Sequence, residues 1–420
     1  MYNLEKYVIF GGTPLKGQVA VSGAKNSALA IVTAAALADS ECYLKNVPRE
    51  SDILTIVEIL RELGVKVDYQ NSTMRIDGSS LCSYQAPYEL VRKMRASFYT
   101  AGLLLARLGK AEVPLPGGCS LGSRPVDFHI KGFQALGAEI NIEHGLMKAE
   151  AKKLVGTKIY INRSSVGATI NLMLAASLAE GTTILENAAK EPEIVDLAIF
   201  LNSMGAKVKG AGTNVIKIEG VKKLSGAEYS IIPDRIEAGT LMIAAAITGG
   251  EVLVTDLVPE HVRSTVLNLQ EAGIQVEEGL SEIKINATER PRSVDVETAP
   301  YPGFPTDLQQ PFVSLMSVAE GTSIIRETIF DRFRYVDELR RMGADIKVEH
   351  GTAIVRGVSK LTGAPVEATD LRAGAALILA GLAAEGVTEV LGIEHIDRGY
   401  EDFDGKLHKL GARINRVKVD

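Results

Sequence analysis

The chain has 420 residues, of which 46% are apolar and 23% charged, and it carries a net charge of −6 with a pI near 5.7. This composition is that of a globular protein of two or three domains and excludes disordered and fibrous classes. The acidic balance argues against nucleic acid or an anionic membrane surface as the main partner, and the longest apolar stretches are about half of what a membrane span needs.

In chain order, the first predicted elements are two strands, YVIFGG at 7–12 and GQVAVSG at 17–23, which need a sheet to join. They are followed by a helix, NSALAIVTAAALAD at 26–39, that is apolar on nearly all sides. A helix without a polar face is buried, and its small side chains permit close packing. Helices of this kind recur at 96–110, 166–181, 237–250, 307–321 and 371–386.

A second pattern recurs in ELGVKV, ALGAEI, SMGAKV, EAGIQV, RMGADI and KLGARI. Its glycines are Gly64, Gly137, Gly205, Gly273, Gly343 and Gly411. Each follows an amphipathic run such as ILTIVEILREL, and alternating residues come next. Glycine adopts positive φ without a Cβ clash, so the pattern predicts a helix that ends at a left-handed glycine and is followed by strands.

The spacing of about 70 residues divides the chain into six pseudo-repeats, each predicted as buried helix, strand, amphipathic helix, strand, strand. Buried helices with sheets outside predict an α/β fold of two inside-out α/β barrel lobes, each of three repeated units. We expect the first lobe to span 23–232, and the second to comprise 1–22 and 233–420 with the crossover near Ser230–Asp234. The active site is expected in a cleft between the lobes.

Polar residues interrupt the repeat at two recurring positions. One position is the start of the buried helix, with Lys25–Asn26, Arg95, Ser165–Gly167, Asp234–Arg235, Asp307 and Asp370–Arg372. The other is the loop before the amphipathic helix, with Ser51–Asp52, Cys119, Arg124, Asp127, Glu191, Glu260–His261, Asp331–Arg332, His395, Asp397 and Arg398. Helix N-termini and forked guanidinium groups attract anions. The expected ligand is a small molecule with several anionic groups.

Simpler explanations compete at several of these positions. Aspartate at a helix start is most often an N-cap, which accounts for Asp234 and competes for Asp307 and Asp370. Arg332 and Arg372 could be solvated surface charges. The histidines His129, His261 and His395 are more often structural than catalytic when nothing pairs with them.

The segment PLPGGCSLGSRP at 114–125 places Cys119 among glycines and prolines, which is loop chemistry. A thiol in this setting is either incidental or reactive, and the sequence favours neither interpretation over the other. With Cys42 and Cys82 it forms no CxxC pair or Cys/His cluster, so neither a disulfide frame nor a metal site is predicted. The start MYNLEKYVIF has no signal-peptide pattern, so we expect a cytoplasmic chain.

These residues carry a resemblance to the UDP-N-acetylglucosamine enolpyruvyl transferase family over essentially the full length. Its markers are SGAKNSAL at 22–29, MRASF at 94–98, LPGGCSLGSRPVDFHI at 115–130, SVGAT at 165–169, FPTDLQ at 304–309, ATDLRAG at 368–374 and HIDRGYE at 395–401. The resemblance implies two inside-out lobes and transfer of enolpyruvyl from phosphoenolpyruvate to the sugar 3′-hydroxyl, with phosphate released in the first committed step of peptidoglycan synthesis. It implies no cofactor, no nucleic acid and no membrane partner, and it leaves the oligomeric state open.

The resemblance also implies roles for residues of this chain. Cys119 would donate a proton to the methylene carbon of phosphoenolpyruvate, and Asp307 would act as base toward the 3′-hydroxyl, with Lys25 and Arg398 completing the catalytic set. The residues implied at phosphoenolpyruvate are Lys25, Asn26, Cys119, Arg124, Arg372 and Arg398. Those implied at the nucleotide sugar are Asn26, Arg95, Arg124, Pro125, Val126, Asp127, Phe128, Arg163, Ser165, Val166, Gly167, Asp307 and Ile329. The Pro/Gly segment around Cys119 would be a lid that closes over the substrates.

Three departures from the family pattern are visible. Arg163 stands where lysine is common, Tyr99 stands where some members have tryptophan, and TIFDRFRYV at 328–336 is one residue shorter, which leaves Arg332 without an assigned role. Two alternatives stay open. One is a 5-enolpyruvylshikimate-3-phosphate synthase-like transferase, and the other is a low-turnover UDP-N-acetylglucosamine-binding regulatory paralogue.

Overall fold

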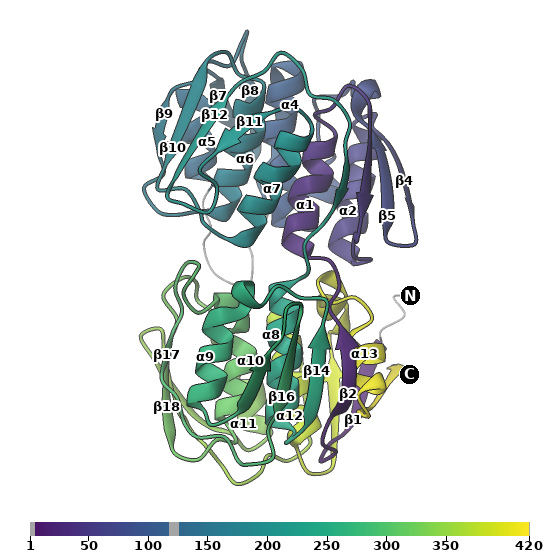
Figure 1. Cartoon of the computed structure of the whole chain (residues 1–420), viewed down its shortest axis with the longest axis vertical. Helices are drawn as coiled ribbons and strands as arrows, with labels where there is room; N and C mark the ends of the chain where they lie inside the picture. Colours follow the sequence, from purple (N-terminus) through teal and green to yellow (C-terminus); the bar gives the residue numbers. More distant parts are fainter. Residues whose placement is uncertain (1–4, 117–125, 420) are drawn as a thin grey trace. The chain divides into compact units, whose positions relative to one another are not determined.

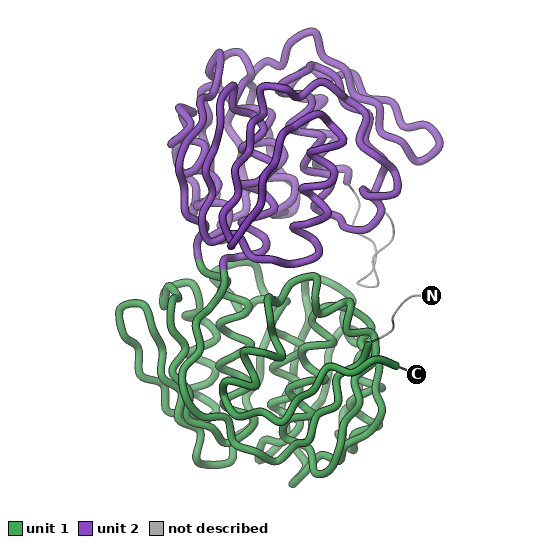
Figure 2. The backbone as a smooth tube through the Cα atoms, turned by 90° about the vertical axis from the view of Figure 1, so that its right-hand side faces the viewer, with its two compact units in different colours: residues 1–22, 120–122, 233–420 green, residues 23–119, 123–232 purple. Residues whose placement is uncertain are grey.

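The computed structural model describes residues 5–116 and 126–419. These residues form two compact units (Figure 2). Unit 1 comprises 5–22 and 233–419, and unit 2 comprises 23–116 and 126–232. The chain therefore leaves unit 1 after its first two strands and returns to it after Ile232. The candidate residues Cys119, Arg124 and Pro125 lie outside the described residues.

Each unit has three nearly all-apolar helices at its centre, as the repeat predicts (Figure 1). In unit 2 these helices are α1 (Lys25–Ala35), α4 (Thr100–Leu108) and α6 (Val166–Ser177). In unit 1 they are α8 (Arg235–Ile247), α10 (Thr306–Met316) and α12 (Leu371–Ala383). Ala, Leu, Ile and Val dominate both cores, and small side chains let the helices approach one another closely.

A second set of helices follows in each repeat. They are α2 (Ser51–Glu62), α5 (Asp127–Ala135), α7 (Pro192–Ser203), α9 (Arg263–Glu271), α11 (Val336–Arg341) and α13 (Phe403–Lys409). The glycine that follows each of these helices has a φ between +86° and +100°, which confirms the predicted left-handed ends. A short additional helix, α3 (Tyr88–Val91), precedes α4.

Three sheets surround the central helices of each unit. The strands of unit 2 are β3 (Glu41–Lys45), β4 (Lys66–Gln70), β5 (Thr73–Asp77), β6 (Lys110–Pro114), β7 (Glu139–Glu143), β8 (Leu146–Glu150), β9 (Lys158–Tyr160), β10 (Thr182–Glu186), β11 (Lys207–Lys209), β12 (Val215–Glu219) and β13 (Glu228–Ser230). They pair in the orders β13-β3-β5-β4, β6-β8-β7 and β11-β12-β10-β9. Polar residues alternate with buried ones along these strands, so one face of each sheet covers the helices.

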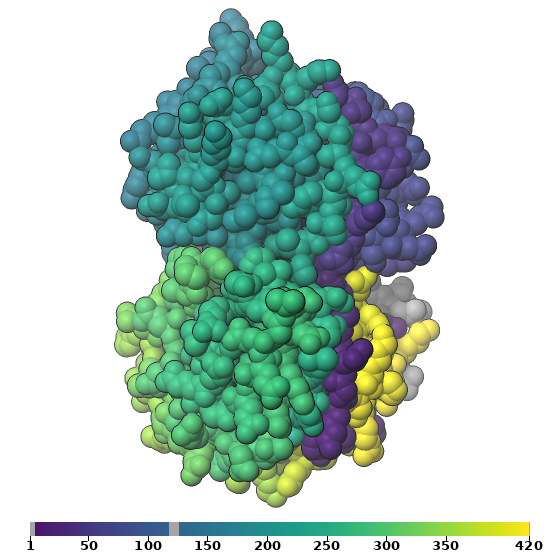
Figure 3. Space-filling model, in the orientation of Figure 1, coloured from purple at the N-terminus to yellow at the C-terminus, as the bar shows by residue number. Residues whose placement is uncertain are grey.

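Unit 1 repeats this arrangement and includes the opening strands. Its strands are β1 (Glu5–Phe10), β2 (Lys16–Ala20), β14 (Glu251–Thr255), β15 (Gln275–Glu278), β16 (Glu282–Asn286), β17 (Val296–Glu297), β18 (Thr322–Arg326), β19 (Asp345–Glu349), β20 (Thr352–Arg356), β21 (Pro365–Glu367), β22 (Val387–Leu391) and β23 (Arg413–Lys418). They pair as β15-β16-β14-β2, β17-β18-β20-β19 and β21-β22-β1-β23. β1 thus lies between β22 and β23 from the far end of the chain (Figure 3), whereas β2 pairs with β14.

The predicted repeat omits one element. A short strand precedes the buried helix and pairs in parallel with the strand that follows that helix, as β9 does with β10 and β21 with β22. These strands have only two to five residues, too few for a clear alternation of apolar and polar side chains. In the β6-β8-β7 sheet the corresponding pairing is reduced to a single bridge between Gln85 and Glu112.

Candidate functional site

In unit 2, the predicted residues lie where the buried helices begin. Lys25 opens α1 and is 7% exposed, and its Nζ lies 2.8 Å from Oδ2 of Asp52 in the first turn of α2. Both charges are buried, so each depends on the other for compensation. Asn26 follows Lys25 on the same turn and is partly exposed. The start of α1 therefore presents a fixed, partly neutralised cation beside a helix N-terminus, a combination that attracts anions.

A second group gathers at the starts of α5 and α6. Ser165 caps α6 by accepting a hydrogen bond from the backbone N–H of Ala168 at 3.3 Å. A Cβ atom added to Gly167 would lie 3.4 Å from Nε2 of His129, so the absence of a side chain at Gly167 lets the two helices approach closely. The structure thereby brings 126–128 and 165–167 together. Within these segments Val126 is buried, Asp127 exposed, and Phe128, Val166 and Gly167 partly exposed.

Arg95 and Arg163 border this group from neighbouring segments. Arg95 begins the 3₁₀ turn η2 (Arg95–Tyr99) that leads into α4, and it is partly exposed. Arg163 precedes α6 and is exposed. An exposed guanidinium near a helix N-terminus adds positive potential there without the cost of burial.

His129 has a structural setting, in agreement with the simpler explanation given above for the histidines. Its Nδ1 lies 2.8 Å from Nδ2 of Asn171, and Asn171 Oδ1 accepts from the backbone N–H of Gly102. Because the Asn171 amide donates to Nδ1, the imidazole proton resides on Nε2. Burial, assisted by the positive charge of Arg95, lowers the pKa of His129 to about 3. His129 is therefore neutral at physiological pH and cannot act as a general acid there.

This buried histidine should make folding stability depend on pH. An unfolded chain binds a proton at His129 below about pH 6.5, whereas the folded chain resists protonation until about pH 3, so stability falls as the pH drops through this interval. The expected loss between pH 7.5 and 5 is about 2 kcal/mol, since each pH unit below 6.5 is worth about 1.4 kcal/mol. Urea unfolding of the wild type and of His129→Gln, whose amide oxygen can accept from Asn171, should show this loss in the wild type alone. An equal loss in both proteins would contradict the assignment.

In unit 1, Asp307 lies at the second residue of α10 and is held by two arginines. Arg332 Nη1 donates to Asp307 Oδ1 at 2.6 Å, and Arg372 donates to Oδ2 from Nη2 at 3.1 Å and from Nε at 3.3 Å. The arginines are only 5% and 3% exposed. The interpretation of Arg332 and Arg372 as solvated surface charges is therefore wrong. Pro305, not Asp307, occupies the N-cap position of α10, so the interpretation of Asp307 as the N-cap is wrong as well.

The other two aspartates are helix caps. Asp234 Oδ1 accepts from the backbone N–H groups of Ile236 and Glu237, and Asp370 Oδ1 accepts from those of Arg372 and Ala373. The Asp370 cap also fixes the backbone from which the Arg372 side chain extends. A capping aspartate contributes about 1 kcal/mol, so both residues have a sufficient structural explanation.

Arg332 is the residue to which the sequence assigned no role. Although the segment 328–336 is one residue shorter than the family pattern, Arg332 still contacts the first turn of α10. Its Nη1 also donates to the backbone oxygen of Thr306 at 2.9 Å, and its guanidinium lies 5.0 Å from the ring centre of Phe330. Among the described residues, Arg332 Nε and Arg372 Nη1 are buried donors without a hydrogen-bond partner. The guanidinium groups of Arg332 and Arg372 thus keep N–H donors that Asp307 does not use. Such groups can bind a further oxyanion.

Arg398 ends the 3₁₀ helix η4 (Ile393–Arg398), which packs on the start of α12. The packing is close, because a Cβ atom on Gly374 of α12 would lie 2.5 Å from Cγ1 of Ile396. Arg372 also lies over the ring of Tyr400, at 5.1 Å from its centre. The partly exposed Arg398 is thus carried by a segment that contacts the helix of Arg372. Its neighbour Asp397 is engaged elsewhere, in an ion pair with Arg416 at 2.6 Å.

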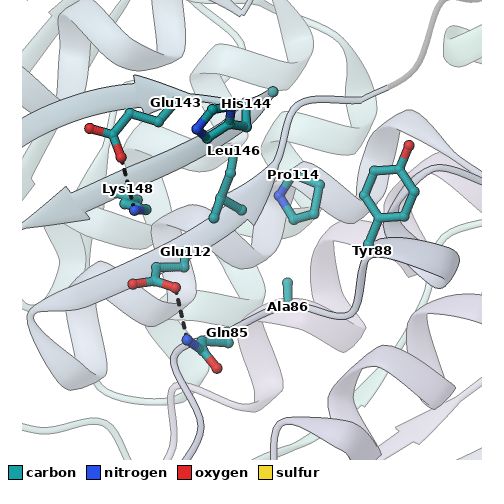
Figure 4. A pocket seen from close by; sticks show the side chains of 10 residues that line it. Gln85, Ala86, Tyr88, Glu112, Pro114, Glu143, His144, Leu146 and Lys148 are labelled. Carbon is teal, nitrogen blue, oxygen red and sulfur yellow. Dashed lines mark hydrogen bonds and ion pairs between the residues drawn. The ribbon is translucent and has the colours of Figure 1, made fainter.

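A separate cavity of about 370 Å³ lies in unit 2, beside the β6-β8-β7 sheet (Figure 4). Of the predicted site residues that the structure describes, none lines it. Four of its polar side chains form two pairs, with Gln85 donating to Glu112 at 2.9 Å and Lys148 to Glu143 at 3.0 Å, and Tyr88 and His144 also line it.

Within 5–116 and 126–419, no three His, Cys, Asp or Glu side chains are grouped so that they could hold a metal ion. Over the same part of the chain, no helix is long and apolar enough to cross a membrane.

Comparisons with known proteins identify the family and agree with the fold. The model of the EPSP synthase (3-phosphoshikimate 1-carboxyvinyltransferase) family matches residues 9–407. The enolpyruvyl transferase NikO from Streptomyces tendae has a similar crystal structure, with a TM-score of 0.90, 26% sequence identity and full coverage of both chains. These matches define the class as that of the 1-carboxyvinyltransferases.

Two curated relatives show to which family within this class the chain belongs. A protein of Caldanaerobacter subterraneus subsp. tengcongensis named UDP-N-acetylglucosamine 1-carboxyvinyltransferase 3 is 56% identical, over 99% of this chain and 100% of its own. UDP-N-acetylglucosamine 1-carboxyvinyltransferase 2 of Symbiobacterium thermophilum is 57% identical over 98% of each chain. The chain belongs to the UDP-N-acetylglucosamine 1-carboxyvinyltransferase family.

Proposed function

We propose that this chain transfers the enolpyruvyl group of phosphoenolpyruvate to the 3′-hydroxyl of UDP-N-acetylglucosamine and releases phosphate. The structural observation that carries the proposal is Asp307, a carboxylate at the start of a buried helix whose two oxygens are held by Arg332 and Arg372. This arrangement combines a hydrogen-bond acceptor for a hydroxyl with fixed cations for an anionic substrate. The full-length relatives named for this reaction support the same acceptor.

The proposed reaction proceeds by addition and elimination. The sugar 3′-oxygen bonds to C2 of phosphoenolpyruvate, C3 gains a proton, and the hydroxyl proton leaves to a base. In the second step C3 loses a proton and the C2–O bond to phosphate breaks, which restores the double bond. In this scheme Cys119 delivers the proton to C3, and Lys25, Arg124, Arg372 and Arg398 hold the carboxylate and phosphate.

The contacts of Asp307 refine its role. A carboxylate offers about four lone-pair sites, and the two arginines occupy part of them, so it can still accept a hydrogen bond from the sugar hydroxyl. Two nearby guanidinium groups stabilise the ionised form and thereby weaken the carboxylate as a base. We therefore assign Asp307 first to orienting the 3′-hydroxyl and second to receiving its proton as the C2–O bond forms.

We assign the nucleotide sugar to the residues that the family resemblance implies, and their placement in unit 2 supports part of this set. The segments 126–128 and 165–167 lie together at the starts of α5 and α6, and Arg95 and Arg163 supply positive charge from adjoining segments. Helix N-termini and guanidinium groups are suited to a diphosphate. Asn26 and, in unit 1, Asp307 and Ile329 complete the set.

We further propose that the reaction takes place in the cytoplasm and commits the sugar to peptidoglycan synthesis. The required chemistry supports this location, because a cysteine that donates a proton must stay a free thiol, and a reducing compartment preserves it.

Identification of the product tests the proposal. The purified protein is incubated with phosphoenolpyruvate and UDP-N-acetylglucosamine, and the nucleotide sugar is analysed by mass spectrometry and proton NMR. The expected product is heavier by one enolpyruvyl group and shows vinyl protons with the substituent on the 3′-oxygen. An unmodified sugar, in the presence of folded protein that binds it, would instead favour the low-turnover paralogue.

A further inference from the structure

Glu327 is a buried carboxylate that the proposed reaction does not use. It directly follows β18 and is 7% exposed. Its Oε1 accepts hydrogen bonds from the backbone N–H groups of Ile329 and Phe330 at 2.8 and 3.0 Å, and from Thr298 Oγ1 at 2.9 Å. Its Oε2 accepts from Thr306 Oγ1 at 2.9 Å. Four donors converge on one side chain, and an ionised carboxylate, which only accepts, suits all of them.

The four donors belong to three separate segments of unit 1. Ile329 and Phe330 form the loop after β18, Thr298 follows β17, and Thr306 is the first residue of α10. The loop is tied to Thr298 a second time, because Thr328 donates to it from both its backbone N–H and its hydroxyl. The carboxylate of Glu327 is therefore the common anchor of the 328–330 loop and the start of α10.

Both segments lead directly to the Asp307 ion pairs. Thr306 precedes Asp307 in the chain, and its backbone oxygen accepts from Arg332. On the loop side, the ring of Phe330 lies against the guanidinium of Arg332. Glu327 thus fixes the backbone next to Asp307 relative to the residues that surround Arg332.

We propose that Glu327 is a positioning residue for the nucleotide sugar, setting the 328–330 loop and Asp307 at a fixed distance from each other. This inference rests on the proposed function, in which Ile329 and Asp307 both contact the sugar nucleotide. A ligand that bridges two segments binds tightly only when their spacing is set in advance, and a small misplacement of the acceptor hydroxyl slows transfer strongly.

The test compares Glu327→Ala and Glu327→Gln with the wild type in steady-state kinetics and in calorimetric binding of UDP-N-acetylglucosamine. For the alanine variant we expect Kd and KM for the nucleotide sugar to rise at least about tenfold, and kcat to fall up to about a hundredfold. The KM for phosphoenolpyruvate should change less than the KM for the sugar. Glutamine should restore most of the loss, since its oxygen can accept from the loop and its amide can donate to Thr306.

The matched control is Glu297→Ala, on the neighbouring strand β17, which removes an exposed partner of Arg326 at 3.4 Å and should change neither KM. Thr306→Val serves as a milder variant should the alanine substitution prevent folding, because it removes only the donor to Oε2. A purely structural role would lower the active fraction and leave Kd and both KM values unchanged, and that result overturns the inference.

The binding data separate this inference from the proposed function. If the wild type binds UDP-N-acetylglucosamine without turnover, the proposed function fails, and the Kd of the Glu327 variants still decides the positioning role. If the wild type does not bind the nucleotide sugar, both fail.

Discussion

Asp307→Asn is expected to lower kcat for enolpyruvyl transfer by at least about a hundredfold, the lower end of what a positioned acid or base contributes. Asparagine keeps the size of the side chain and one oxygen acceptor, but it cannot receive the hydroxyl proton and it places an NH₂ group against one of the two arginines. The measurement is steady-state phosphate release with saturating substrates, together with urea unfolding of the same preparation.

The alanine variant at this position should differ from the asparagine variant in stability. Removing the carboxylate leaves two buried guanidinium groups without their partner, which costs about 3 kcal/mol or more. Asp307→Ala should therefore lose both activity and stability, and the asparagine variant is the cleaner test of catalysis. The control is Asp345→Asn, an exposed partner of Arg356, which should leave both unchanged. Turnover of Asp307→Asn within about threefold of the wild type would refute a role in the proton transfer assigned above.

Cys119→Ala is expected to slow turnover at least tens of fold, as loss of a general acid does, while UDP-N-acetylglucosamine still binds. Cys119 lies outside the described residues, so this prediction comes from the sequence, which places the thiol in a Pro/Gly loop, and from the family resemblance. Phosphate release gives the rate and calorimetry gives the binding constant. Cys82→Ala is the matched control, since Cys82 is an exposed free cysteine for which the proposal has no role. A Cys119→Ala protein with wild-type turnover would show that another group protonates C3.

Much of the fold follows from local rules that one sequence displays. The six glycines after amphipathic runs mark left-handed helix ends, and all six have positive φ. The all-apolar helices are central because no face of them can meet water. Asp234 and Asp370 could be interpreted as caps because an N-cap depends only on neighbours two or three residues along the chain.

The missed features depend on contacts between residues far apart in the chain. Arg332 reaches Asp307 across 25 residues and Arg372 does so across 65, so a one-residue shortening near 331 gave no indication of whether the ion pairs survive. Glu327 directly follows the last residue of β18, and a glutamate is rarely buried unless its charge is compensated, so nothing in the sequence indicated a buried carboxylate there. A signal was nevertheless present for Arg332, because it occupies the recurring loop position before an outer helix at which Arg398 also stands.

The central claim is that transfer requires the nucleotide sugar as acceptor, and phosphate release tests it most directly. The purified wild type is supplied with phosphoenolpyruvate alone, with UDP-N-acetylglucosamine, and with shikimate 3-phosphate. We expect steady phosphate release with UDP-N-acetylglucosamine and only background release with the other two mixtures. Release with shikimate 3-phosphate would instead show a 5-enolpyruvylshikimate-3-phosphate synthase activity, and no release with either acceptor would contradict the proposed reaction for this chain.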